Sequence, residues 1–388
     1  MAFSSATVTI GQPTKKSDYD RLMANTQYNK STYKTHNGTI NIHTPVTIST
    51  ATASGGSDGD TWFSRGFTIG IYTNISGTWK YTPGVYTKVS GVWKTIVSGY
   101  TNVSGIWKLF YNNIVNGFFG GGYTGGTNGH ISYIDKTLTT QNSISRGELS
   151  VARYGAGGLS GHLLGFFCGG TTGSDSNIID YIEKNTLSGN ASDKGDLTTS
   201  RNRPGGVQDT IYGFIGGGTF NILDYIAVTT TSENASSRGT LSVDRYGISG
   251  VSGPIYGFFG GGNSSNIIDY IDLSLTSGNA IDRGNMTVTG SGRGGISGAT
   301  YGFFGGGDVP ANTNVIDYIN MSLTTGNAID RGDLSSARGA LAGVSGHNYG
   351  FFGGGDVNVI DYIDPTLITG NASACGTLDI SESSLAGI

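Results

Sequence analysis

The sequence is poor in cysteine, proline and charge, and it lacks long apolar runs. It contains 2 Cys and 7 Pro in 388 residues, and 13% of its residues are charged. A chain of this length needs no disulfide to fold, so Cys168 and Cys375 are predicted to be unpaired. No stretch approaches the roughly 18 consecutive apolar residues of a membrane span. The N-terminus lacks the basic residues followed by an apolar run that mark a secretory signal peptide, so none is predicted.

The scarce charge is divided unevenly along the chain. Residues 1–110 have ten Lys and Arg against four Asp and Glu, a net charge of +6. Residues 111–388 have 13 against 23, a net charge of −10. This shift predicts a domain boundary near Tyr111. The negative charge of the second part argues against nucleic acid or an anionic lipid surface as its ligand.

Motifs of catalytic and metal-binding sites are missing too. The histidines stand in separate segments without the spacing of metal ligands, which favours ordinary solvated or hydrogen-bonded side chains. They are His36, His43, His130, His162 and His347. No Gly-X-Ser-X-Gly elbow precedes a helix, and the glycine-rich loops end strands, so neither a hydrolase nor a phosphate-binding loop is indicated. We therefore expect no cofactor, no metal and no enzymatic activity.

Glycine, by contrast, is abundant, and its 67 copies recur in register. The Gly-Phe-Phe-Gly-Gly-Gly segment at residues 117–122 returns in similar form at spacings of 48, 48, 44, 45 and 48 residues. The later copies begin at Gly165, Gly213, Gly257, Gly302 and Gly350. Each copy is followed by an Ile-Asp-Tyr-Ile-type strand, a Ser/Thr-Gly-Asn-Ala stretch and an Arg-Gly-X-Leu step. A period of this size, with about four short strands per unit, predicts an all-β, six-bladed β-propeller.

The two ends of the repeat predict how the ring closes. Residues 384–388 match residues 340–344, a strand that precedes the next Gly-Phe-Phe segment. The first Gly-Phe-Phe segment has no such strand before it. We therefore expect residues 381–388 to pair beside residues 117–122 and to complete the first blade. Closure of this kind leaves no long free edge.

Several polar residues recur with the repeat. An Asp precedes Tyr in five copies, at Asp180, Asp224, Asp269, Asp317 and Asp361. An Arg recurs in the next strand, at Arg146, Arg238, Arg283 and Arg331. Recurrence favours a structural role, in which buried Asp or Tyr groups bond an Arg or a backbone amide, over a ring of binding sites. Ser132 replaces the Asp, and Cys375 and Glu382 replace Arg, all at the predicted closure.

The copies differ most in the connection after Gly-Gly-Gly, which varies from three to eight residues. These connections join equivalent strands, so they are expected to emerge on one face of the ring. Short polar side chains beside aromatic ones suit hydroxyl-rich ligands, although tolerant surface loops remain the alternative interpretation. The candidate ligand-binding residues are Tyr123, His130, Asp175, Asn177, Phe220, Asn263, Asn266, Asp308, Asn312, Asn314, Asp356 and Asn358.

The Gly-Gly pairs, the Asp-Tyr pairs and the upstream arginines Arg153, Arg245 and Arg338 resemble degenerate kelch repeats over residues 117–388. The tryptophan usual in kelch repeats is missing, because all four tryptophans precede residue 108. The resemblance implies the propeller architecture and leaves the function open, since kelch-type propellers serve many functions.

The first 110 residues are organised differently. We expect strands at residues 7–10 and 38–50, a helix over residues 17–28 that Ser17 caps, and a flexible joint at residues 51–59. Residues 61–110 contain three units that end in Trp-Lys, each predicted to be a β-hairpin. Short hairpins bury little alone, so exposed tryptophans favour an intertwined homotrimer. The predicted oligomerisation residues are Trp79, Trp93 and Trp107.

The order of elements in residues 1–110, and above all the Val-Ser-Gly-Val-Trp-Lys hairpins, resembles the virion-anchoring ends of bacteriophage tail-fibre and tail-adhesin proteins. The resemblance implies an anchoring region at residues 1–60, a trimerising hairpin region at residues 61–110 and an outward-facing propeller at residues 111–388. The anchor would attach to phage tail or baseplate proteins. The protein would then belong to the virion, after assembly in the host cytoplasm.

These observations together predict a phage receptor-binding protein whose propeller loops bind a host cell-surface polysaccharide or protein. Two alternatives stay open. The propeller could be a structural virion component that binds no ligand, or it could be a glycan hydrolase or lyase acting on the host envelope.

Overall fold

The computed structural model describes residues 114–388, apart from Ser264, Val309 and Pro310, and the backbone of seven strands between residues 61 and 112. All regular structure in this described part is β-strand, and Ile114–Ile388 form one compact unit. The helix predicted over residues 17–28, the early strands and the joint at residues 51–59 lie outside the described residues.

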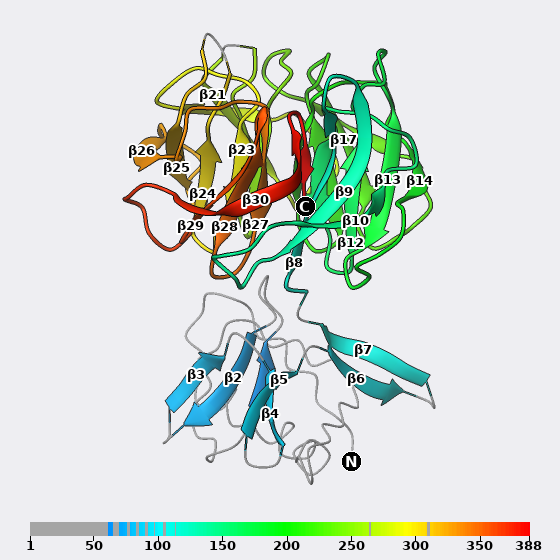
Figure 1. Ribbon diagram of the computed structural model, residues 1–388, viewed down its shortest axis with the longest axis vertical. Coiled ribbons are helices and arrows are strands. Elements are labelled where there is room, and N and C mark those ends of the chain that lie inside the picture. Colours follow the sequence, from blue (N-terminus) through cyan, green and yellow to red (C-terminus); the bar gives the residue numbers. More distant parts are fainter. Residues whose placement is uncertain are drawn as a thin grey trace. The chain divides into compact units, whose positions relative to one another are not determined.

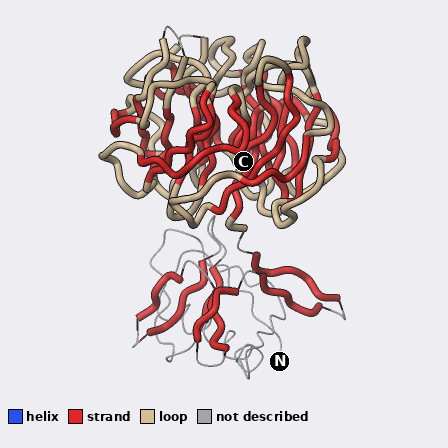
Figure 2. Tube along the Cα trace, viewed as in Figure 1, coloured by secondary structure: helices blue, strands red, loops and turns tan. Residues whose placement is uncertain are grey.

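Six four-stranded antiparallel sheets are arranged as the blades of a β-propeller, which confirms the predicted architecture (Figures 1 and 2). We number the blades 1–6 along the chain from β8. From blade 1 to blade 6, the inner strands are β31 (Ala386–Gly387), β11 (Gly157–Ser160), β15 (Gly205–Gln208), β19 (Ser249–Ser252), β23 (Gly294–Ser297) and β27 (Leu341–Ser345). The second strands are β8 (Asn116–Tyr123), β12 (Leu164–Cys168), β16 (Tyr212–Gly216), β20 (Tyr256–Gly260), β24 (Tyr301–Gly305) and β28 (Gly350–Gly354).

The outer half of each blade follows the same plan. The third strands are β9 (Thr127–Asp135), β13 (Ile178–Glu183), β17 (Ile222–Ala227), β21 (Ile267–Asp272), β25 (Val315–Asn320) and β29 (Val357–Ile363). The outer strands are β10 (Ile144–Glu148), β14 (Ser192–Asp196), β18 (Ser236–Thr240), β22 (Ile281–Asn285), β26 (Ile329–Asp333) and β30 (Ser373–Glu382).

The inner strands contact one another in a closed ring around the axis. Each contributes a glycine whose missing side chain matters, because a Cβ there would overlap the carbonyl oxygen of the corresponding glycine in the neighbouring blade. The six are Gly158, Gly206, Gly250, Gly295, Gly343 and Gly387. Backbone therefore packs against backbone around the axis, which only glycine permits at this distance.

The last residues of the chain complete blade 1. Strand β31 pairs with β8, with Ala386 opposite Gly120 and Gly387 opposite Phe119. Ile388 and Phe118 exchange two backbone hydrogen bonds of 2.9 and 3.0 Å. These contacts confirm the predicted closure by residues 381–388.

Apolar side chains from both sides of each sheet fill the spaces between blades. In β25, Ile316 and Tyr318 pack toward blade 6, whereas Ile319, on the opposite side, packs toward blade 4. This is the two-residue alternation expected of a strand buried on both faces. Six such clusters lie between the six pairs of neighbouring blades.

Neighbouring blades also match in side-chain size. In five blades, one glycine of the second strand faces a phenylalanine ring of the next blade, as Gly260 faces Phe304. This glycine directly follows the two large apolar residues of the strand. Blade 3 has Ile215 in place of that phenylalanine, and blade 2 has Cys168 in place of the facing glycine. Both residues are fully buried in one cluster. Both cysteines are free, as predicted.

The strands before the propeller are β1 (Thr61–Ser64), β2 (Gly70–Ile75), β3 (Thr78–Thr82), β4 (Val85–Val89), β5 (Val92–Ile96), β6 (Ser98–Val103) and β7 (Ile106–Asn112). Backbone pairing joins β2 with β3, β4 with β5, and β6 with β7 as antiparallel hairpins. The three Trp-Lys hairpins are thus present in the backbone, with Trp79, Trp93 and Trp107 in their second strands. Their side chains lie outside the described part, so the trimer interface stays a prediction.

Candidate functional site

The propeller has two faces of different construction. The loop face, as we call it, consists of the connections from second to third strands and from each outer strand to the next inner strand. The turn face consists of the connections from inner to second strands and from third to outer strands. The chain joins the propeller at Asn116 on the turn face, where the Val115 carbonyl accepts a 2.7 Å hydrogen bond from the Lys136 amide. The loop face is therefore opposite the point of attachment.

The turn face exposes aliphatic side chains at equivalent positions of several blades. Leu163, Ile211 and Ile255 precede second strands, and Leu138, Leu275, Leu323 and Leu367 follow third strands. Their recurrence follows the repeat, as expected of residues that belong to the common blade plan.

The loop face exposes aromatic side chains at positions that are not equivalent. Tyr123 is 43%, Phe220 45% and Tyr246 47% exposed. Tyr123 also makes an edge-on contact with Tyr154, with ring centroids 5.2 Å apart. Aromatic rings presented among short polar side chains are typical of sites that bind hydroxyl-rich ligands.

The structure places all twelve candidate ligand-binding residues on or at the edge of the loop face. Seven are exposed, namely Tyr123, Asp175, Phe220, Asn263, Asn312, Asp356 and Asn358. Five are partly buried, namely His130, Asn177, Asn266, Asp308 and Asn314. The carbonyls of Asn177, Asn266 and Asn314 each accept a 2.7 Å backbone hydrogen bond from the following outer-to-inner connection, so these three share one structural position.

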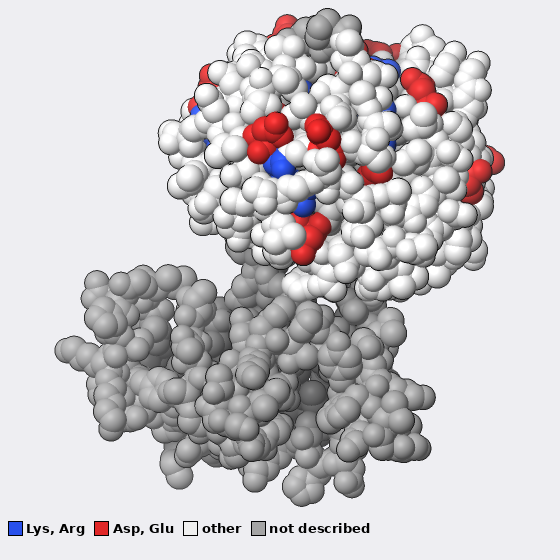
Figure 3. Space-filling model, turned by 60° about the vertical axis from the view of Figure 1, so that its left-hand side comes forward, with Lys and Arg blue, Asp and Glu red and all other residues white. Residues whose placement is uncertain are grey.

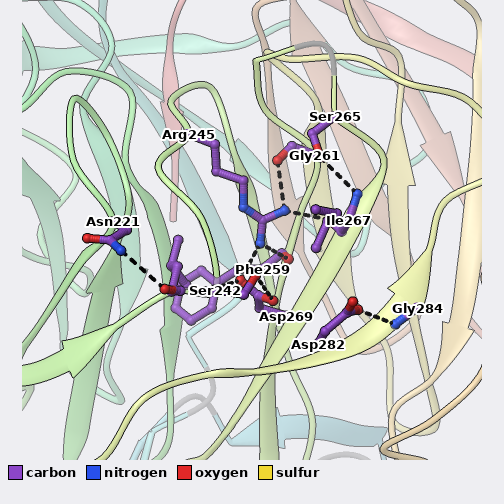
Figure 4. A network of polar contacts seen from close by, with 11 residues as sticks. Asn221, Ser242, Arg245, Phe259, Gly261, Ser265, Ile267, Asp269, Asp282 and Gly284 are labelled. Carbon is purple, nitrogen blue, oxygen red and sulfur yellow. Dashed lines mark hydrogen bonds and ion pairs between the residues drawn. The ribbon is translucent and has the colours of Figure 1, made fainter.

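Below this face, the recurrent Asp and Arg residues form buried ion pairs. In blade 4, the Arg245 guanidinium lies 2.7 Å from the Asp269 carboxylate, which also accepts a 2.7 Å hydrogen bond from the Ser242 hydroxyl (Figure 4). The corresponding pairs are Arg153–Asp180, Arg201–Asp224 and Arg338–Asp361. All of these side chains are buried, which confirms the structural interpretation for these four aspartates. The fifth, Asp317, is also buried and accepts hydrogen bonds from the amide and hydroxyl of Thr287.

The outer-strand arginines also have a structural role. Arg238 donates hydrogen bonds to the carbonyls of Leu275 and Gly278 in the next blade, and its guanidinium lies 5.4 Å from the centre of the Phe214 ring. Arg146, Arg283 and Arg331 make the same contacts. These four arginines connect blades 1, 3, 4 and 5 to the following blade and are not available to a ligand.

In blade 1, other residue types stand at all three positions of the buried polar cluster. Where blades 2, 3, 4 and 6 have Ser or Thr, Asp and Arg, blade 1 has Asp379, Ser132 and Glu382. Burial, and next the Asp379 carboxylate, raise the pKa of Glu382 to about 8. Asn128 donates a 2.6 Å hydrogen bond to the Glu382 carboxyl group. Glu382 is only 3% exposed, so its carboxyl group is closed to a substrate.

His130 belongs to this closure rather than to the open loop surface. Its Nε2 lies 2.8 Å from Asp379 Oδ2, and the Ser143 hydroxyl donates a 2.8 Å hydrogen bond to the other oxygen. Burial acts to raise the pKa of Asp379, but these two hydrogen bonds outweigh it and lower the pKa. Within residues 114–388 as described, no cluster of His, Cys, Asp or Glu is arranged to hold a metal ion.

On the face of the propeller drawn in Figure 3, acidic side chains are more prominent than basic ones, although some Lys and Arg atoms also reach the surface. Of its thirteen Lys and Arg residues, eleven are buried. The two exceptions are Lys136, which lies on the turn face, and Arg203, which lies on the loop face. Most acidic residues, by contrast, reach the solvent. A polyanion would therefore be repelled.

Arg203 is the functional candidate that the sequence did not single out. It lies in an outer-to-inner connection, whereas the candidates were sought in the connections that vary in length. A signal was present, since the equivalent residues in other blades are Gly155, Gly247, Gly292, Ala340 and Ser384, all small.

No protein-family profile matches the chain, and no curated protein is similar enough to count as a relative. The site must therefore be interpreted from its own chemistry. Among the described residues, none forms a helix of the length and apolarity that a membrane span requires.

Proposed function

We propose that this protein is a bacteriophage tail-fibre or tail-adhesin subunit, and that the loop face of its propeller binds a carbohydrate on the host cell surface. The observation behind the proposal is the contrast between the two faces. The exposed large apolar residues of the turn face are aliphatic, whereas the loop face exposes the aromatic residues Tyr123, Phe220 and Tyr246 beside Asn, Asp and Ser side chains. A binding site on a symmetric scaffold is expected where the symmetry is broken.

The physical chemistry of the loop face favours sugars over other ligands. Aromatic rings give flat apolar surface for sugar rings, and short amide and carboxylate side chains accept and donate hydrogen bonds to hydroxyl groups. The acidic surface disfavours nucleic acid, as well as anionic membranes. A rigid ring of blades holds the connections in place, so little conformational entropy is lost on binding.

The rest of the chain supplies the remaining parts of the proposal. Residues 1–60 would anchor the protein to the phage tail, and the hairpins of residues 61–110 would assemble three chains. Three kelch-like propellers would then raise the avidity of a weak site without any new contact. Light scattering should give a particle of about three times 40.2 kDa for the full chain, and a monomer would remove this multivalent part of the proposal.

The proposal is tested by binding the fluorescently labelled full chain to a panel of bacterial strains. We expect Phe220→Ala and Tyr246→Ala to reduce binding by about tenfold or more, as loss of a stacked aromatic anchor does. Leu275→Ala and Ile255→Ala are matched controls, because these turn-face residues are 53% and 55% exposed. Unchanged binding by the loop-face variants would contradict the proposal. Shortening of the host polysaccharide by the protein would instead favour a glycan hydrolase or lyase.

A further inference from the structure

Backbone hydrogen bonds form a closed ring on the loop face around the propeller axis. Five of its six bonds join one residue of an outer-to-inner connection to the equivalent residue of the next. In the sixth, the Gly292 carbonyl accepts from the amide of Leu341, which follows Ala340. The six bonds are 2.7–3.3 Å long. In Arg203, for example, the amide donates to the Gly155 carbonyl and the carbonyl accepts from the Gly247 amide. The ring residues are Gly155, Arg203, Gly247, Gly292, Ala340 and Ser384, and all six have positive φ, between 54° and 68°.

Positive φ makes the residue type at these positions informative. Glycine adopts it freely, whereas a residue with a Cβ loses roughly 1 kcal/mol or more there. Ala340 and Ser384 are at least small, but Arg203 has the longest side chain of the ring. A strained backbone at a residue with a long polar side chain points to a function for that side chain.

The Arg203 side chain crosses over the ring toward its far side. Its Nη2 donates a 2.9 Å hydrogen bond to the hydroxyl of Ser384, which is two ring positions away. Its Nη1 lies 3.8 Å from the carboxylate of Asp308, which in turn accepts a short hydrogen bond from Ser291 beside the ring residue Gly292. The guanidinium therefore lies over the centre of the loop face.

The guanidinium is not fully used by these partners. Its side chain is 27% and that of Asp308 23% exposed, and a 3.8 Å ion pair at this exposure contributes little. Arginine has five N–H donors, whereas only two of its nitrogen atoms have a partner here. Donors remain for an external group.

Two tyrosines lie in the connections that neighbour Arg203 in the ring. Tyr154 precedes Gly155 and Tyr246 precedes Gly247, the two ring residues hydrogen-bonded to Arg203. Tyr246 is 47% exposed. No other ring residue follows an aromatic residue. A single guanidinium with tyrosines in the neighbouring connections has the chemistry to bind a carboxylate on a sugar ring.

We propose that Arg203 binds the carboxylate of an acidic sugar residue in the host glycan. This inference rests on the proposed carbohydrate-binding function and assigns its substrate class. The ligand carboxylate takes the position beside Nη1 that Asp308 now occupies loosely, and the two tyrosines contact the sugar ring. One carboxylate in an otherwise neutral glycan fits this surface, because a densely charged polymer would meet the surrounding acids.

The test measures binding of glucuronic acid, galacturonic acid and N-acetylneuraminic acid to the full chain by ligand-observed NMR, with glucose and galactose as neutral counterparts. We expect at least one acidic sugar to bind about tenfold more tightly than its neutral counterparts, a difference typical of a charge-assisted contact. Arg203→Gln should abolish that difference. Asp308→Asn, which removes the competing carboxylate, should strengthen binding of the acidic sugar.

Two further variants separate binding from folding. Arg203→Gly introduces the residue found at three other ring positions, so it should fold and still lose the preference for acidic sugars. Ala340→Gly relieves the same positive φ without removing a cation, and its sugar binding should match that of the parent.

Equal binding of neutral and acidic sugars, or an acidic preference that survives Arg203→Gln and Arg203→Gly, would overturn the inference. Labelled protein that binds bacteria, with no competition from any acidic sugar, would also overturn it while leaving the proposed function intact. Acidic-sugar binding that requires Arg203, together with no binding to any bacterium, would support the site and contradict the attachment function.

Discussion

At the residue scale, the blades differ in how they accommodate buried charged groups. Four blades neutralise a buried Arg with a buried Asp, which removes two charges from water at the cost of their hydration. Blade 1 has no Arg at this position and buries Glu382 instead. The carboxyl group can stay neutral there only by holding its proton, which explains its raised pKa.

The raised pKa of Glu382 makes stability depend on pH. The folded-state pKa is about 8 and the ordinary value is 4.5, so between these values the folded state binds more protons than the unfolded state. The contribution of Glu382 to the free energy of unfolding therefore decreases as pH rises through this window. Glu382→Gln removes the titration, and urea unfolding at several pH values should show a smaller loss of stability than in the parent. Parallel curves for the two proteins would contradict the assigned protonation.

Two aspartates in blade 4 give a matched comparison (Figure 4). Asp269 is fully buried against Arg245, whereas Asp282 is exposed and accepts a 2.8 Å hydrogen bond from the Gly284 amide. Asp269→Asn leaves a buried guanidinium without its counter-charge and should cost about 3–5 kcal/mol of unfolding free energy. Asp282→Asn should cost no more than about 1 kcal/mol. Equal losses in denaturant unfolding would show that the buried pair is not the stabilising contact.

At the scale of elements, the second strands determine how blades fit together. A glycine on one blade leaves room for an aromatic ring of the next, as Gly216 does for Phe259. At the interface of blades 2 and 3, the larger Cys168 stands in place of the glycine and the smaller Ile215 in place of the phenylalanine. The repeat therefore conserves the total volume between blades and not the identity of each residue, which is the rule for well-packed cores.

This complementarity predicts a compensating pair of substitutions. Ile215→Phe alone should destabilise the propeller by about 1–3 kcal/mol, because the larger ring would overlap Cys168. Adding Cys168→Gly restores the arrangement of the other interfaces and should recover most of that loss. A double-mutant cycle in urea measures the coupling, and additive effects of the two substitutions would contradict the size match.

At the scale of the whole molecule, stability depends on closure of the ring by the last residues. Ser384 bonds to Ala340 of blade 6 and to Gly155 of blade 2, while Ile388 pairs with Phe118 of blade 1. Five residues therefore join three blades. Without them, β8 would present an unpaired edge, which templates aggregation.

Deletion of residues 384–388 tests this role. We expect a lower midpoint of thermal unfolding, a loss of cooperativity and aggregation on heating, since blade 1 would lose its inner strand. Differential scanning calorimetry and light scattering measure these changes. A truncated chain that unfolds at the parental temperature in one transition would show that closure contributes little.

The sequence predicted the fold better than the site. Strand order, blade number and closure followed from a repeat that is visible in Gly-Phe-Phe spacing, because hydrophobic pattern and glycine position are local signals. The structural role predicted for the repeated aspartates is confirmed for the four that pair with a buried Arg. Arg203 was missed because its position depends on a positive φ and on contacts with Ser384 and Asp308, which are far away in the sequence. Such long-range geometry has no local signature.

The most direct test of the account is to locate a bound glycan on the propeller. Hydrogen–deuterium exchange of the full chain would be measured with and without surface polysaccharide from a bacterium that the protein binds. The account predicts slower exchange in loop-face residues 149–156, 197–204 and 241–248, with the turn face unchanged. Protection confined to the turn face, or no protection of the propeller at all, would contradict the assignment of the loop face as the binding surface.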